Sequence, residues 1–224
     1  MEYKYDCKNR NTLIMIKMMI AFFKDYFKYK NEIDKQSKWI EQYAEKKNYA
    51  VNPNKMIATN LKIWLSEMEG IYSKRFCPCF DPSGGKENDK AMICPCKYID
   101  DEIEEYGTCH CALFGKKDLS KEDWKKSGKR LMKEYRIPLN IEGNTLDTRG
   151  MQIDKHRGLP IPDASHQLKN TLLNHKAKEL DIIVATEQEV FNLEKIAKYK
   201  GYSFGSNQKD DYHIVKLGLA KDKK

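Results

Sequence analysis

The chain has 224 residues, of which 40% are hydrophobic and 33% are charged. This balance is ordinary for a globular protein and excludes the low-complexity classes, and the length suffices for one large or two small domains. The formal charge of +8 predicts a basic surface, to which nucleic acid, an anionic membrane or an acidic protein would be drawn alike, so charge alone does not select a partner.

The first half of the chain predicts three helices. Residues 12–30 read as one amphipathic helix, whose apolar residues recur at spacings of three and four: Leu13, Ile16, Ile20, Phe23 and Phe27. We expect this helix to pack on its own domain or on a partner. A second helix is expected around 36–47. A third opens with Asn52 as its cap and Pro53 in its first turn, and ends at Gly70.

The second half predicts a different pattern, in which strands alternate with helices. The expected elements are a basic helix near 120–135, a strand at 144–151, a helix at 163–175, a strand at 180–186, and two strands at 202–205 and 212–218. Thr186 and Glu189 form a capping box that opens a further helix, and Gly201 closes it. The order β-α-β-α-β-β predicts a small two-layer domain.

The whole chain is therefore expected to be α+β, with a mainly helical part followed by a βαβαββ domain. Four segments are expected: an N-terminal amphipathic helical extension at 1–36, a cysteine-rich domain at 37–118, a basic helical linker at 119–142 and the α+β domain at 143–219. No stretch approaches the roughly 20 apolar residues of a membrane span. The N-terminal segment also lacks the small-residue cleavage site of a signal peptide.

Six of the seven cysteines form three Cys-x-Cys pairs within 35 residues. The pairs are Cys77 with Cys79, Cys94 with Cys96, and Cys109 with Cys111. A secreted disulfide scaffold spreads its cysteines through a small domain, so this clustering favours a metal or redox site in a reducing, cytoplasmic setting. A cubane [4Fe–4S] cluster takes four thiolates, and the two that remain suit a redox-active disulfide.

A structural zinc site with spare thiols is the alternative. Zinc modules usually space their ligands as Cys-x₂₋₄-Cys, so that both sulfurs turn toward one ion. Here one residue separates the cysteines of each pair, and in two pairs that residue is a proline with a fixed φ. The spacing therefore disfavours zinc, although a zinc-stabilised module that binds nucleic acid or protein stays open.

The motif CPC-x₁₄-CPC-x₁₂-CHC followed by ALF resembles the catalytic (beta) chain of ferredoxin–thioredoxin reductase. The segment WIEQYAEKKNYAVNPNK at 39–55 is also similar to the lead-in helix and turn of that family. The resemblance covers about residues 38–115. The gap between the first and second cysteine pairs is shorter than in the plant-type enzyme, and the gap between the second and third pairs is longer. Phe80 also stands where the family commonly has Arg. Both departures bear on the identity of the partner.

The resemblance implies an oxidoreductase that takes single electrons from ferredoxin and reduces a thioredoxin-like protein, with or without a small partner subunit. It implies four cluster ligands, which are Cys77, Cys94, Cys96 and Cys109. Cys79 and Cys111 would form the active-site disulfide, and His110 would move protons as it opens and closes. Residues 116–136 carry nine Lys/Arg against four Asp/Glu, and this basic segment would steer an acidic ferredoxin rather than nucleic acid.

The C-terminal part, at about 144–217, resembles the small sulfur-carrier (TusA/SirA-like) family through LDTRGM and LPIP. That family carries its functional cysteine immediately before Pro-x-Pro. In this chain Leu159 holds that position and no cysteine follows Cys111. The resemblance therefore implies a docking domain rather than a persulfide carrier, and an accessory role in sulfur trafficking is the third open alternative.

Overall fold

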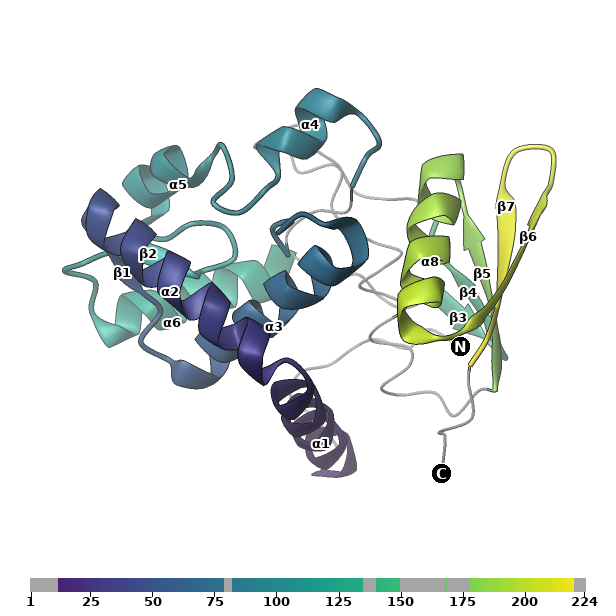
Figure 1. The fold of residues 1–224 in the computed structure, drawn as a ribbon, viewed down its shortest axis with the longest axis horizontal. Coiled ribbons are helices and arrows are strands. Elements are labelled where there is room, and N and C mark those ends of the chain that lie inside the picture. The colour runs from purple at the N-terminus through teal and green to yellow at the C-terminus, as the bar shows by residue number, and fades with distance from the viewer. Residues whose placement is uncertain (1–11, 79–81, 135–139, 150–167, 169–177, 220–224) are drawn as a thin grey trace. The chain divides into compact units, whose positions relative to one another are not determined.

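The computed structural model describes residues 12–78, 82–134, 140–149, 168 and 178–219 (Figure 1). The chain forms two compact units. The first, here called the cysteine unit, comprises Met19–Cys79 and Gly85–Arg136. The second, the C-terminal unit, comprises Met1–Met18, Phe80–Gly84 and Ile137–Lys224. In the described part of the chain, every helix is too short or too polar to cross a membrane.

The helices of the first half lie close to where the sequence predicts them. They are α1 (Thr12–Lys28), α2 (Lys30–Lys47), α3 (Lys55–Tyr72), α4 (Lys86–Ala91), α5 (Ile99–Tyr106) and α6 (Lys121–Glu134). Two short strands, β1 (Tyr49–Val51) and β2 (Phe114–Lys116), pair antiparallel. Strand β1 follows α2 and strand β2 follows the last cysteine pair, so this ladder joins the lead-in helices to the cysteine region.

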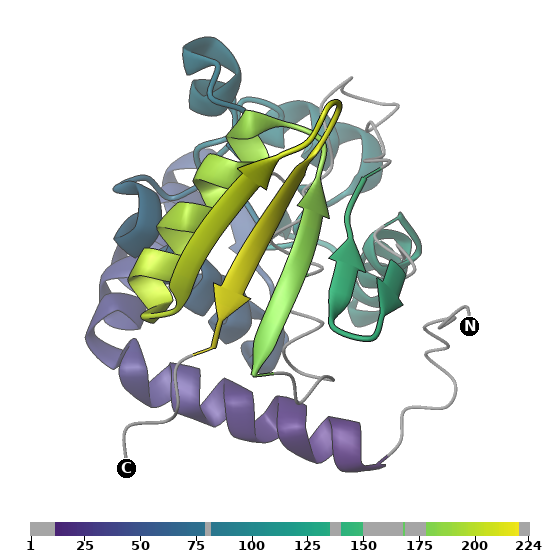
Figure 2. The ribbon, with the colours of Figure 1, turned by 90° about the vertical axis from the view of Figure 1, so that its right-hand side faces the viewer.

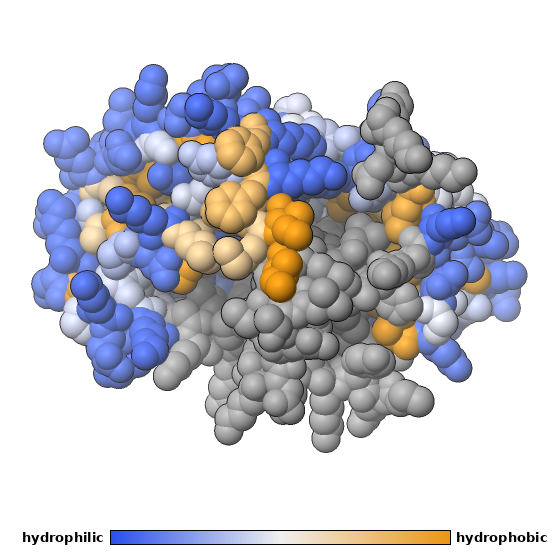
Figure 3. Space-filling view, turned by 90° about the horizontal axis from the view of Figure 1, so that it is seen from below, coloured by the Kyte–Doolittle hydropathy of each residue, from blue (hydrophilic) through white to orange (hydrophobic). Residues whose placement is uncertain are grey.

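The first helix ends earlier, and the second begins earlier, than predicted. The chain breaks at Tyr29, whose ring is buried, and α2 then starts at Lys30 rather than near residue 36. The buried face of α2 carries Ile33 and Ile40. On α1, by contrast, large apolar side chains are exposed, namely Ile16, Met19, Ile20, Phe23 and Phe27. Figure 3 shows hydrophobic residues on the face seen from below.

The prediction for the start and end of the third helix was wrong. Asn54, not Asn52, is the N-cap, and its side chain accepts from the amides of Met56 and Ile57. The helix continues through Gly70 to Tyr72 and ends at Ser73 in the left-handed region. Of the apolar residues of this helix, Leu65 is fully buried, while Ile57 in the first turn is exposed.

Asn52 instead connects this turn to the end of the cysteine region. Its side-chain amide donates to the carbonyl of Ala112 at 2.8 Å, and its carbonyl oxygen accepts from the amide of Asn54 at 2.9 Å. Its backbone amide donates to the carbonyl of Leu113 at 2.9 Å. Because Asn52 is buried and all these groups are paired, it holds the turn after β1 against the loop that carries Cys111.

The C-terminal unit is built on a five-stranded sheet of order β3-β4-β5-β7-β6 (Figure 2). The strands are β3 (Asn140–Glu142), β4 (Thr145–Asp147), β5 (Glu179–Val184), β6 (Ser203–Gln208) and β7 (His213–Gly218). Strands β4 and β5 are parallel, and the other neighbours are antiparallel. Strand β3 was not predicted. The helix expected at 163–175 lies outside the described residues except for Leu168, which is helical and buried.

Helix α8 (Glu187–Lys200) covers one face of this sheet (Figure 1). Its capping box is confirmed: the Thr186 hydroxyl accepts from the amide of Glu189, and the Glu189 carboxylate accepts from the amide of Thr186. Gly201 closes the helix in the left-handed region, as predicted. Leu193 on its inner face is fully buried. Both ends of this helix were predicted correctly because the residues that cap them are near neighbours in sequence.

The contact made by Asn52 predicts the effect of its removal. Asn52→Ala leaves the buried carbonyl of Ala112 without that donor, so the free energy of unfolding of the cysteine unit should fall by about 1–3 kcal/mol. Denaturant unfolding followed by tryptophan fluorescence measures this, because all three tryptophans lie in that unit, namely Trp39, Trp64 and Trp124. Asn60→Ala, on the exposed side of α3, is the matched control. Equal losses in the two variants would contradict this role for Asn52.

Candidate functional site

Backbone bridges bring the first two cysteine pairs together. Phe76 and Ile93 form an isolated antiparallel bridge. Beside it, the amide of Cys77 donates to the carbonyl of Met92 at 2.9 Å, and the amide of Cys94 donates to the carbonyl of Arg75 at 2.7 Å. The peptide bond between Cys94 and Pro95 is cis. Two loops separated by 14 residues in sequence are thus held at a fixed register, with Cys77 and Cys94 adjacent to the bridge.

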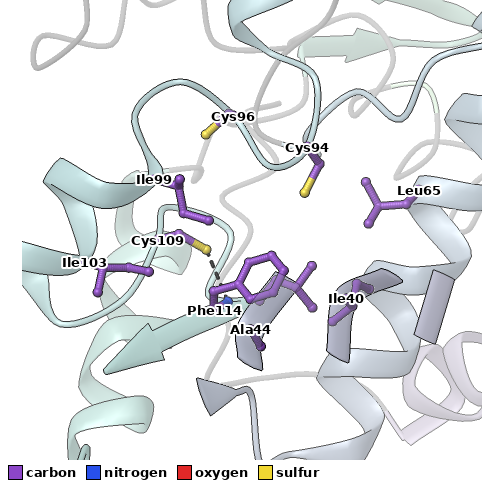
Figure 4. Packing of buried hydrophobic residues seen from close by; sticks show 10 residues of the cluster. Ile40, Ala44, Leu65, Cys94, Cys96, Ile99, Ile103, Cys109 and Phe114 are labelled. Atoms are coloured by element: carbon purple, nitrogen blue, oxygen red, sulfur yellow. Dashed lines mark hydrogen bonds between the residues drawn. The ribbon is translucent and has the colours of Figure 1, made fainter. Parts of the chain in front are cut away.

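The cysteines are part of the hydrophobic core of their unit. Cys94, Cys96 and Cys109 pack in one cluster with apolar residues from α2, α3, α5 and β2 (Figure 4). These neighbours are Ile40, Ala44, Leu65, Ile99, Ile103, Leu113 and Phe114. Cys77 is also buried, with 2% of its surface exposed. The four residues predicted as cluster ligands are therefore withdrawn from water, whereas Cys111 is only half-buried.

The buried sulfurs act on one another electrostatically. Burial, followed by the neighbouring thiols of Cys77 and Cys109, raises the pKa of Cys94 well above its usual value. A hydrogen bond with Cys77, burial and the charges of Cys77 and Cys109 raise the pKa of Cys96. Arg75 opposes the shift at Cys94. Ionisation of Cys94 and of Cys96 is thus disfavoured, and a bound cation would offset the burial and the neighbouring charges.

The donor set fits an iron–sulfur group in its chemistry. Four buried cysteines lie within electrostatic range of one another, and a [4Fe–4S] cluster takes four thiolates. Across the described ranges, no three His, Cys, Asp or Glu side chains are arranged so that they could hold a metal ion. The fold therefore buries enough cysteine sulfurs for such a group, but within the described ranges their side chains are not arranged as metal ligands.

The third pair lies in a tight loop closed by its own backbone. The amide of Cys109 donates to the carbonyl of Phe114, and the amide of Ala112 donates to the carbonyl of Cys109, both at 2.9 Å. The amide of Phe114 donates to the sulfur of Cys109 at 3.3 Å (Figure 4). Ala112 has φ of 56°, in the left-handed region. This turn brings the sulfurs of Cys109 and Cys111 to 3.8 Å from each other.

His110 is held by a buried carboxylate that the sequence did not identify. Glu102 on α5 has 2% of its surface exposed. One oxygen accepts from the backbone amide of His110 at 2.7 Å, and the other lies 3.5 Å from the Nδ1 of its ring. Glu102 stands between Ile99 and Ile103, which are buried on the same helix. That helical spacing, with apolar residues on either side of Glu102, was the available signal.

The basic helix α6 packs directly beside this loop. Trp124 is buried, and a Cβ at Gly115 would lie 2.8 Å from its ring, so glycine is needed for the close approach. The hydroxyls of Ser127 and Thr108 are hydrogen-bonded, and Thr108 immediately precedes Cys109. Lys125 and Lys126 on the same helix are exposed. Helix α6 therefore packs through Trp124 and Ser127 beside the segment that carries the third cysteine pair, and Lys125 and Lys126 are on its exposed face.

The remaining predicted site residues are outside the described part of the chain. These are Cys79, which was assigned to the active-site disulfide, together with Phe80 and Leu159. Cys79 follows the described residues Cys77 and Pro78 in sequence. The other members of the predicted site, five cysteines and His110, are described, and they come from two loops and the turn before β2.

Residues 27–136 match the family described as ferredoxin thioredoxin reductase catalytic beta chain. The match spans just under half of the chain and contains all three Cys-x-Cys pairs. It ends at the same residue as the cysteine unit, and residues 137–224 lie beyond it. No curated protein matches the chain. The reductase resemblance noted in the sequence is therefore found independently, at the level of the family.

The buried carboxylate under His110 generates a prediction. Glu102→Ala leaves the amide of His110 without its acceptor, so the free energy of unfolding of the cysteine unit should fall by about 2 kcal/mol. Denaturant unfolding read by tryptophan fluorescence tests this value. Glu104→Ala removes an exposed carboxylate from the same helix and should cost little. If the two substitutions destabilise the unit equally, Glu102 does not hold the loop.

Proposed function

We propose that residues 27–136 form the catalytic part of a [4Fe–4S] disulfide reductase, which takes single electrons from ferredoxin and reduces a thioredoxin-like protein. The observation that carries the proposal is the set of four buried, mutually interacting thiols with a fifth, half-buried thiol 3.8 Å from one of them. A purely structural site would have no use for an accessible thiol beside it. The family match supports the same assignment.

The proposed ligands are Cys77, Cys94, Cys96 and Cys109. When bound, the cluster would supply single electrons, of which opening one disulfide requires two. The residues of the chain contribute the environment. Burial keeps water from the sulfurs, and the amide of Phe114 directed at the sulfur of Cys109 stabilises negative charge there.

Cys79 and Cys111 are proposed to carry out the disulfide chemistry. Two electrons and two protons would convert their disulfide to two thiols. The thiolate of Cys79 would then attack one sulfur of the partner's disulfide, forming a mixed disulfide and releasing a thiolate on the partner. Attack by the thiolate of Cys111 on Cys79 would release the second partner thiol and restore the original disulfide. The half-buried position of Cys111, beside a proposed ligand, supports this role.

His110 is proposed to deliver and accept protons in these steps. It lies between Cys109 and Cys111 in sequence, and its imidazole is partly exposed. Glu102 fixes its backbone and stands near Nδ1, which orients the ring. An imidazole suits this task because it changes charge close to neutral pH. Glu102 is thus a positioning residue for His110.

Energy favours the reaction in the proposed direction. A plant-type ferredoxin near about −400 mV and a thioredoxin near about −270 mV differ by roughly 6 kcal/mol for two electrons. The task left to the protein is to bring the donor close to the cysteines. Helix α6 supports this, because it packs beside the segment that carries the third pair and its exposed Lys125 and Lys126 would attract an acidic donor.

The C-terminal unit is proposed to be a TusA/SirA-like domain that serves in docking rather than in sulfur transfer. The mixed sheet supports the proposal, since β4 and β5 are parallel and β7 is antiparallel to β5. The position of the family's cysteine is held by Leu159, and no cysteine follows Cys111. Transfer of a persulfide would need a thiol, so that function is not proposed.

The cysteine roles are tested by single substitutions to serine. Loss of any proposed ligand, Cys77, Cys94, Cys96 or Cys109, should abolish bound iron in anaerobically purified protein, because the site would have only three thiolates. Cys79→Ser should retain iron and colour but fail to reduce a disulfide, since only the attacking thiol is lost. Iron analysis and a disulfide-reduction assay measure both. If Cys79→Ser loses iron while Cys77→Ser keeps it, the assignment within the first pair is reversed.

The role of His110 is tested by His110→Gln. Glutamine preserves the backbone amide that binds Glu102 but cannot carry a proton at neutral pH, so turnover should fall by about 10²-fold while the iron content stays the same. Single-turnover reduction of a small disulfide gives the rate, and chemical analysis gives the iron. Loss of iron in this variant would make His110 a structural support or ligand and would remove the proton-transfer role.

The proposed ferredoxin face is tested by charge reversal on α6. The double variant Lys125→Glu/Lys126→Glu should slow electron transfer from ferredoxin by about tenfold at low salt, because exposed charges steer the encounter. Added salt should slow the unmodified protein, since the Debye length is only about 8 Å at physiological ionic strength. Lys35→Glu/Lys38→Glu on α2 is the matched control. Equal rates in both variants, or indifference to salt, would show that ferredoxin docks elsewhere.

A further inference from the structure

The C-terminal unit has a strand whose outer side is open to a further strand. Strand β6 ends the sheet order β3-β4-β5-β7-β6, and among the described residues it pairs with β7 alone (Figure 2). Edge strands are usually protected by charged side chains, by proline or by a short length. The six residues of β6 include no charged side chain and no proline. Strand β3, at the other edge, is only three residues long and ends in Glu142. Strand β6 is therefore the less protected edge of the sheet.

The register of β6 with β7 shows which backbone groups point toward this open edge. Just past the ladder, the amide of Lys209 donates to the carbonyl of Tyr212 at 2.8 Å. Because hydrogen-bonded pairs alternate along an antiparallel ladder, the next residues of β6 bonded to β7 are Asn207, Gly205 and Ser203. The amides and carbonyls of the intervening residues point outward, and these residues are Phe204, Ser206 and Gln208.

A pocket of about 310 Å³ lies beside this edge, between the β6–β7 hairpin and α8. Helix α8 lines it with residues at spacings of three and four, which share one face of the helix, namely Glu187, Val190, Phe191 and Glu194. The strands line it with Ser206, Gln208 and His213. A residue of an added strand directly opposite Ser206 would have its side chain on the same face of the sheet. That side chain would therefore enter the pocket.

The lining of the pocket suits a lysine or arginine side chain. Glu187 and Glu194 are exposed, and both carry a carboxylate on the face of α8 that lines the pocket. Phe191 has 48% of its surface exposed, and the ammonium of Lys195 lies 4.8 Å from the centre of its ring. This ring thus already contacts one cation. A basic side chain in the pocket would pack its apolar stem on Val190 and Phe191 and hold its charge near the carboxylates.

We propose that the edge of β6 and the adjoining pocket bind an extended segment of a partner protein that carries a lysine or arginine. The segment would pair antiparallel with β6 through the outward backbone groups of that strand, and its basic side chain would occupy the pocket. A second copy of β6 does not fit this chemistry, because that strand has no basic residue to offer the carboxylates. The inference rests on the docking role proposed for the C-terminal unit, to which it gives a surface and a class of partner.

Peptide binding to the full chain tests the edge. The probe is a fluorescent peptide of alternating threonine and lysine, as long as β6, and its binding is followed by anisotropy at low salt. In the antiparallel arrangement the lysines enter the pocket, and their backbone amides face β6. N-methylation of the lysine amides should therefore weaken binding by about tenfold, whereas N-methylation of the threonine amides should have little effect. Equal affinities of the two methylated peptides would overturn the proposal.

The pocket is tested by removing its carboxylates. Glu187→Gln/Glu194→Gln should weaken binding of the unmethylated lysine peptide by about tenfold, because the charges that attract its ammonium groups are lost. Glu104→Gln/Glu105→Gln removes two exposed carboxylates from α5 and is the matched control. A peptide of alternating threonine and glutamate should bind about tenfold more weakly than the lysine peptide. If the two double variants bind the lysine peptide equally, the pocket does not select the basic side chain and the proposal fails.

A backbone variant separates the proposed partner from a second copy of the chain. Ser206→Pro removes an outward amide and should weaken peptide binding, whereas Ser206→Ala keeps that amide and should not. Circular dichroism shows whether Ser206→Pro folds, and if it does not, the methylated peptides on the unmodified protein decide. Size-exclusion chromatography gives the oligomeric state. A dimer of the unmodified protein that Ser206→Pro converts to a monomer would show that a second copy occupies the edge, and it would overturn the proposal.

These measurements are independent of turnover. A protein that binds the lysine peptide as expected but reduces no disulfide would contradict the proposed reductase and leave this inference standing. A protein that reduces a disulfide but does not bind the peptide would contradict this inference alone.

Discussion

Burial of the cysteine sulfurs is the constraint on which the cysteine unit depends. Cys94, Cys96 and Cys109 occupy core positions that aliphatic side chains would fill in another protein, and Cys77 is equally withdrawn from water. Burial and the neighbouring thiols raise the pKa of Cys94, and a hydrogen bond with Cys77, together with burial and the neighbouring charges, raises the pKa of Cys96. The arrangement is costly for free thiolates and favourable for thiolates that share a cationic iron–sulfur group.

The loops that carry these sulfurs are short and irregular, so other parts of the chain must hold them. The bridge between Phe76 and Ile93 sets the first two pairs in register, and Asn52 and Glu102 hold the third pair from β1 and α5. Each support fixes backbone: the bridge pairs two loops, the Asn52 amide binds the carbonyl of Ala112, and the Glu102 carboxylate binds the amide of His110. The sulfurs are thus placed by backbone geometry.

Sequence reasoning succeeded where the chemistry is local. The capping box of Thr186 with Glu189 and the closing Gly201 involve neighbours a few residues apart, and the cysteine pairs were visible as a spacing pattern. It failed where a partner far away in sequence determines the role of a residue. Asn52 was assigned as a cap, but its side chain is engaged by Ala112, sixty residues away, and Asn54 takes the cap. Glu102 was missed because its role depends on the loop that carries His110, whose amide it accepts in the folded chain.

The central claim is that the buried thiols hold a cubane cluster. Iron and acid-labile sulfide, measured together in anaerobically purified protein, test it most directly. The account predicts brown protein with about four iron and four sulfide per chain, since one cubane uses four thiolates. Colourless protein that contains zinc and no sulfide would contradict it, because the site would then lack any group able to pass electrons to the disulfide.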